Sequence, residues 1–173
     1  MKKLLLPFFF ICNIAMMVVM NKTGATLKTA ATPHGIINLE FAYNNVKTNA
    51  IINAWAPINE IDNIAVAKIN TWFDFLFICA YAFFFFFACT KIAGNIKGTL
   101  SKVGNNIAKA ALLAGFFDVL ENAGMLLTLN GYVNSSVAFL TTFFSVLKWG
   151  LVLLVVLYLL IALLVLAYQK LNK

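Results

Sequence analysis

The chain has 173 residues, of which 62% are hydrophobic and only 11% are charged, about half the charged share of soluble proteins. So much apolar surface excludes an ordinary water-soluble protein and indicates a single domain that has a membrane as its solvent. The net charge of +7 comes from scattered lysines without any arginine, a distribution that argues against nucleic-acid binding.

Four stretches are long enough to cross a bilayer as helices, which takes about 20 residues. They cover about residues 4–20, 69–90, 107–129 and 137–168. The sequence therefore predicts an all-α integral membrane protein, a four-helix bundle in which residues 1–173 form one transmembrane domain. The last stretch exceeds the thickness of a bilayer, so we expect it to be tilted or to project from the membrane.

The first stretch has two interpretations. It follows Lys2 and Lys3, a basic start that a cleaved signal peptide would also have. However, the apolar run is long for a signal peptide, and no small-x-small cleavage pattern closes it. We therefore expect a retained span, with a cleaved signal peptide as the alternative.

The segment between the first two spans, residues 21–68, mixes polar and apolar residues. Between Pro33 and Pro57 the apolar side chains recur irregularly, a pattern that suits an amphipathic helix on the membrane surface or over the end of the bundle. Asn59 is a candidate start for the next helix, which would then continue into the second span.

The distribution of lysine predicts the orientation, because loops rich in lysine stay in the cytoplasm. Lysines precede the first span, occupy the 91–106 loop without any acid, and end the chain, whereas residues 21–68 offset lysines with acids. We therefore expect a multi-pass protein of a bacterial inner membrane. Both termini and the 91–106 loop would be cytoplasmic, and residues 21–68 would be periplasmic.

Polar residues inside the predicted spans are the candidates for function, because each set lies on one helix face. These sets are Asp74 and Tyr81 in the second span, Asp118, Glu121 and Asn122 in the third, and Thr141, Ser145 and Lys148 in the fourth. At 1.5 Å per residue, Asp118 and Lys148 lie roughly 16 Å from the outer ends of their spans. The sequence thus predicts that these groups meet at a similar depth.

The cost of a charge in lipid predicts where these groups point. A charged side chain at mid-bilayer costs about 2.5–3.5 kcal/mol on insertion scales, so the acids are expected to face inwards. Lys148 is the lysine at their depth, and one ammonium cannot balance three carboxylates. Either water enters from the outer side or at least one carboxyl keeps its proton, and both cases indicate a polar pocket that opens outwards. The simpler alternative is a Lys–Asp pair that only joins helices.

Three further residues each have two possible roles. Asp74, nearer the outer end of its span, is either a member of the pocket or a solvated helix-end residue. His34, the only histidine, and Glu40 both lie in residues 21–68. They are candidates for the mouth of the pocket, with ordinary solvated positions as the alternative.

No metal site or cofactor is predicted. The three cysteines lie in apolar runs without metal-ligand spacing, as small buried hydrophobic residues do. The sequence also contains no phosphate-binding glycine loop, no nucleophile elbow and no pair of histidines for a haem.

Three phrases together resemble small, uncharacterised bacterial integral membrane proteins with four predicted helices. They are "NLEFA" at 38–42, "FDFLFICAYA" at 73–82 and "FDVLEN" at 117–122. In that family an acidic residue recurs in the second helix and an Asp-x-x-Glu-Asn pattern in the third. The resemblance implies that five residues form one set, namely Glu40, Asp74, Asp118, Glu121 and Asn122. It implies no particular activity.

Three functions remain compatible with the sequence. The first is binding or moving a small polar or amphiphilic ligand through the outward pocket, with or without a coupled proton. The second is a membrane-embedded enzyme for a lipid or isoprenoid head group, with Asp118 or Glu121 as base and Lys148 as electrostatic stabiliser. The third is an assembly subunit. The lipid bilayer is the expected partner, together with further copies of the chain or a larger membrane complex.

Overall fold

The computed structural model describes residues 2–57 and 61–171, and within them the chain is all-α, with four long helices. These are α1 (Lys2–Thr23), α4 (Asn63–Ala93), α5 (Thr99–Leu129) and α6 (Ser135–Leu171). Each is long and apolar enough to cross a membrane, which takes about 20 residues. The predicted all-α bundle of a multi-pass membrane protein is therefore confirmed.

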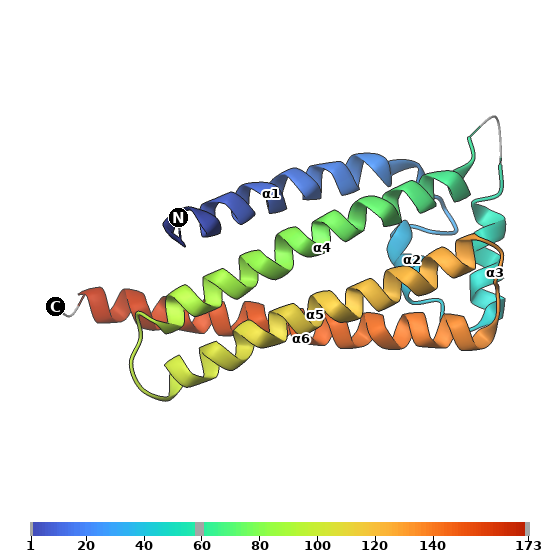
Figure 1. Ribbon diagram of the computed structural model, residues 1–173. Helices are drawn as coiled ribbons and strands as arrows, with labels where there is room; N and C mark the ends of the chain where they lie inside the picture. The colour runs from blue at the N-terminus through green and yellow to red at the C-terminus, as the bar shows by residue number, and fades with distance from the viewer. Residues whose placement is uncertain (1, 58–60, 172–173) are drawn as a thin grey trace.

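The long helices alternate in direction, so the start of α1 and the end of α6 lie at the same end of the bundle (Figure 1). α5 packs against both α4 and α6, and α4 also touches α6. α1 packs mainly along α4. Consequently none of the described side chains in the apolar stretch of α1 is buried, and α1 is the least enclosed of the long helices.

The beginning of α4 is set by Asp62, whose carboxylate accepts hydrogen bonds from the backbone N–H groups of Ile64 and Ala65, each at 3.0 Å. Such a cap satisfies donors that have no partner at a helix start. As a result α4 begins at Asn63, earlier than the predicted span, while the expected start at Asn59 lies outside the described residues. Asp74 therefore lies roughly 16 Å from the start of its helix, at 1.5 Å per residue.

The segment between α1 and α4 folds over the other end of the bundle (Figure 1). It contains the short helices η1 (Ala25–Leu27), α2 (Ile36–Glu40) and α3 (Asn45–Ala54). The expected amphipathic helix is thus divided in two. The division occurs because the side chain of Asn44 accepts the N–H of Lys47 at 2.9 Å and starts a new helix. Trp55 holds this segment together, because its fully buried indole donates to the carbonyl of Leu27 at 3.1 Å.

Small residues on the buried face of α5 allow its neighbours to approach closely. Gly104, Ala108, Ala111 and Gly115 follow one another along this face. At Gly104 the neighbour is Tyr158 of α6, which is only 5% exposed. The packing of α5 at Gly104 is therefore sensitive to a single added methyl group.

Gly104→Ala is expected to lower the free energy of unfolding by about 1–3 kcal/mol, the usual cost of overpacking a close contact. The added Cβ would overlap the ring end of Tyr158 and come within 2.8 Å of the Ala93 Cβ. Denaturant unfolding of the purified protein in detergent measures the change. Gly150→Ala on α6 is the matched control, because a Cβ there meets nothing within 4 Å, and it should be neutral or stabilising. Equal losses in both variants would contradict the packing argument.

Candidate functional site

A buried cluster of charged groups is centred on the ammonium of Lys148. Among the described residues, Nζ lies 2.8 Å from Glu121, 2.9 Å from Asp118 and 3.4 Å from Glu40. None of these side chains is more than 9% exposed. A buried charge is tolerated only when it is paired and hydrogen-bonded, so the position of the lysine determines where the carboxylates gather.

Helix geometry explains how these groups meet. Asp118 and Glu121 are one turn apart on the buried face of α5. Lys148 lies roughly 20 Å from the start of α6, and Asp118 roughly 16 Å from the end of α5, at 1.5 Å per residue. Since the two helices pack side by side, the long lysine side chain spans the remaining difference. The groups that the sequence predicts will meet are therefore in contact in the structure.

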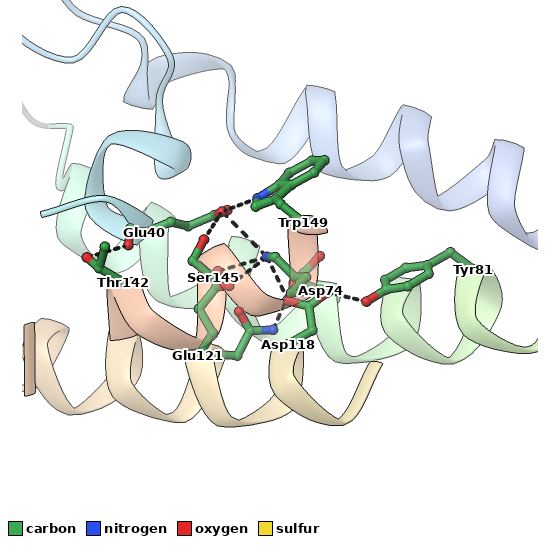
Figure 2. Close-up of polar contacts among 10 residues, drawn as sticks. Glu40, Asp74, Tyr81, Asp118, Glu121, Thr142, Ser145 and Trp149 are labelled. Carbon is green, nitrogen blue, oxygen red and sulfur yellow. Dashed lines mark hydrogen bonds and ion pairs between the residues drawn. The ribbon is translucent and has the colours of Figure 1, made fainter. Parts of the chain in front are cut away.

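Glu40 reaches this cluster from α2, the short helix over the end of the bundle (Figure 2). Its Oε2 accepts from the Ser145 hydroxyl and the Trp149 indole, each at 3.2 Å, as well as from Lys148. Its backbone carbonyl accepts from the Thr142 hydroxyl at 2.9 Å. Glu40 thus ties α2 to α6 and lies inside the site, rather than being an ordinary solvated residue.

Two hydrogen bonds connect α4 to the same cluster. The Tyr81 hydroxyl donates to Asp118 at 2.7 Å, and the Asn122 amide donates to Oδ2 of Asp74 at 2.8 Å. Asp74 is half-buried and lies beside the acids of α5, so the structure does not support the alternative of a solvated helix end. Within the described residues, the site brings three carboxyl groups to one ammonium group and places Asp74 beside them without a cation.

A cavity of about 400 Å³ adjoins the cluster, between α1, α4 and α6 and next to α2. One part of its wall is polar and includes Asp74, Asp118 and Lys148. Most of the remaining lining is apolar and includes Met17 of α1 and Phe77 of α4, while Asn13 of α1 and Asn70 of α4 add further polar groups. An apolar cavity with a few convergent polar groups, in a size range of about 300–1,000 Å³, is typical of a site for a small molecule.

Two of the predicted site residues are not brought to this cluster. The Thr141 hydroxyl donates to the carbonyl of Val137 in its own helix at 2.9 Å, and it packs against Gly124 of α5. His34 is exposed, and its backbone N–H bonds to the side chain of Asn38 at 2.8 Å. Neither is among the residues that line the cavity. The structure brings together the other predicted site residues: Glu40, Asp74, Tyr81, Asp118, Glu121, Asn122, Ser145 and Lys148.

Other residues of the site have weaker signals in the sequence. Thr142 follows Thr141, and helical spacing places Thr141 on the face of Lys148, yet Thr142 is the residue that bonds to Glu40. Trp149 donates to Glu40 and lies 5.5 Å from the Lys148 ammonium, measured to its ring centre. Asn13 lines the cavity from α1. As the one amide in residues 4–20, it could have been found as a polar group in an apolar run.

The chain matches no protein family, no curated protein and no solved structure. The resemblance to small four-helix membrane proteins therefore stays a prediction, and the cluster and the cavity are the features that bear on function. No group of three or more His, Cys, Asp or Glu side chains suited to a metal ion occurs in the described part of the chain.

Proposed function

We propose that this protein binds an amphiphilic small molecule in the cavity between α1, α4 and α6. The supporting observation is the cavity of about 400 Å³, whose lining combines many apolar residues with members of a buried ionic cluster. An amphiphile complements both parts of this wall, with its apolar portion against the side chains of α1 and α4 and its polar portion toward the carboxylates.

The proposed membrane orientation is that of a bacterial inner-membrane protein with both termini in the cytoplasm. It is supported by the lysine-rich, acid-free residues 91–106, which cover the end of α4, the connection and the start of α5, and by the lysines at both ends of the chain, following the positive-inside rule. Tyr132, in the turn between α5 and α6, is exposed at the opposite end of the bundle, where aromatic side chains suit a membrane interface. The cavity then lies in the outer half of the bilayer, covered by α2.

The ligand enters from the side, between α1 and α6. α1 packs mainly along α4, while Met17 of α1 and Trp149 and Val152 of α6 all line the cavity. Met17 and Trp149 are also 53% and 46% exposed, so the cavity wall there is continuous with the surface that faces lipid. An amphiphile dissolved in the outer leaflet can reach the cavity by this route without passing through water.

The internal pairing of the charges supports ligand binding over the two other functions. In an assembly subunit, buried charges would pair with helices of another protein, yet Lys148 already contacts three carboxylates of its own chain within the described residues. An enzyme that used Lys148 to stabilise a developing negative charge would need an ammonium that faces the substrate. These carboxylates compete with any such role.

A cavity-filling substitution tests the proposal. Val152→Trp places a larger side chain into the cavity, and it is expected to reduce the amount of co-purified or added amphiphile at least about tenfold, the effect of roughly 1.4 kcal/mol. Native mass spectrometry of the protein released from mild detergent measures the bound fraction. Leu153→Trp is the matched control, because Leu153 is the next residue of α6 and is 58% exposed.

Both variants should unfold at the same temperature as the parent protein within a few degrees. Equal retention of the ligand by the Val152→Trp and Leu153→Trp proteins would contradict binding in this cavity. So would the absence of any bound amphiphile in the unaltered protein after incubation with octanol and octylamine.

A further inference from the structure

The hydrogen-bond donors on the ionic side of the cavity are already engaged within the chain. The Lys148 ammonium is surrounded by carboxylates, and the Trp149 indole donates to Glu40 at 3.2 Å. The Tyr81 hydroxyl donates to Asp118 at 2.7 Å. Because these donors have partners, this wall has little capacity to bind a ligand through the ligand's own acceptors.

Acceptors near the cavity remain open. Asp74 lines the cavity and accepts one hydrogen bond, on Oδ2 from Asn122; in the part of the chain that the structure describes, no cation pairs with it. Asn122 behind it is fully buried, and its Oδ1 has no partner. On the α1 side, Asn13 also lines the cavity, and its buried Oδ1 is likewise without a partner. Asp74, as a carboxylate, can only accept hydrogen bonds. Because buried polar atoms are nearly always hydrogen-bonded, its spare acceptor capacity favours a ligand that donates.

The excess of carboxyl groups in the site also favours a ligand that donates hydrogen bonds. The site contains the carboxyl groups of Glu40, Asp118 and Glu121 around Lys148, and Asp74 is a further carboxyl group 2.8 Å from a neutral amide. A cavity lined by an excess of one charge attracts the opposite charge. A ligand with a positive group would therefore be favoured at Asp74, and an anionic head group would be repelled.

We infer that the ligand is an amine-bearing amphiphile whose ammonium group binds to Asp74. Its alkyl portion lies against the apolar wall that includes Met17, Phe77 and Val152. This inference rests on the proposed function and narrows it, because it excludes fatty acids and anionic lipids, and it assigns to Asp74 the role of recognising the ligand. Asp74 suits that role because, among the described residues, the ion pairs of Lys148 are all with other carboxylates, which leaves Asp74 free to pair with a ligand.

Three probes with the same chain length test the inference: octylamine, octanol and octanoate. Binding to the full-length protein in lipid nanodiscs is measured by isothermal titration calorimetry. Octylamine is expected to bind at least about tenfold more tightly than octanol, in keeping with the greater strength of hydrogen bonds to charged groups, and octanoate more weakly than both. Asp74→Asn should remove the preference for octylamine, whereas Asp74→Glu should keep it.

The outcomes separate this inference from the proposed function. If octanol and octylamine bind equally to the unaltered protein and both are lost in Val152→Trp, the amphiphile site stands and the amine specificity is overturned. If octylamine binds equally well to the Asp74→Asn and unaltered proteins, the assignment of Asp74 is overturned. If none of the probes binds, or if Val152→Trp changes nothing, the proposed function itself fails. The Asp74→Glu protein shows that any loss in Asp74→Asn comes from charge rather than misfolding.

Discussion

Lys148→Met is expected to lower the free energy of unfolding by about 3–5 kcal/mol, the cost of removing one partner from a buried ion pair. Methionine has nearly the same length and fills the same space, so the loss comes from charge and hydrogen bonding. Without the ammonium, the carboxylates of Glu40, Asp118 and Glu121 would face one another with no cation between them. Denaturant unfolding of the purified protein in detergent, followed by circular dichroism, measures the change.

Two comparisons isolate the charge effect. Lys109→Met alters an exposed lysine of α5, and it should change stability by no more than about 0.5 kcal/mol. Adding Asp118→Asn and Glu121→Gln to Lys148→Met should recover about 2 kcal/mol, because neutral amides in the same positions need no counter-charge. If the triple variant is as unstable as Lys148→Met alone, the cluster is held by packing rather than by charge.

The sequence predicted the groups of the site that lie on the long helices, because helix periodicity and depth depend only on spacing along the chain. Asp118, Glu121 and Asn122 share a face at i, i+3, i+4, and the cost of charges in lipid turns that face inwards. The depth of Lys148 in the fourth span then predicts that its ammonium meets these acids. The structure agrees, with the Lys148 ammonium within 2.9 Å of Asp118 and Glu121.

The contacts of Glu40 could not be predicted in this way. Glu40 ends a helix of five residues, and its partners on α6 are more than 100 residues away in the sequence. No periodic pattern indicates how a short helix folds back over a bundle, since tertiary packing decides that. The same reason applies to Thr142. Its hydroxyl bonds to the backbone of Glu40, although helical spacing does not place Thr142 on the face that carries Thr141, Ser145 and Lys148.

The cavity was predicted only as a polar pocket, without its apolar wall. The spacing of polar residues indicated an interior site, but it could not show that α1 packs mainly along α4 and leaves space toward α6. α1 is apolar all around apart from Asn13 and its ends, so its sequence does not define which face meets the bundle. The position of Asn13 at the cavity depends on that packing.

Glu40→Ala is expected to lower the free energy of unfolding by about 1–3 kcal/mol, because it leaves the buried Ser145 hydroxyl and the partly exposed Trp149 indole without an acceptor. The Ser145 hydroxyl and the Trp149 indole both donate to the carboxylate that the substitution removes, whereas Lys148 keeps its closer partners on α5. The loss should be concentrated at α2, so backbone amides in Ile36–Glu40 should exchange with solvent faster than those of α4 and α5. Hydrogen exchange followed by mass spectrometry measures this difference.

Glu40→Gln is the matched control, because its side-chain oxygen can still accept from Ser145 and Trp149, and it should cost less than about 1 kcal/mol. The backbone carbonyl of residue 40 continues to accept from Thr142 in both variants, so any difference between them belongs to the side chain. If the two variants lose stability equally, the negative charge of Glu40 holds α2 in place. If neither changes the exchange of α2, the packing of Leu39 and its neighbours is sufficient to hold the cover over the cavity.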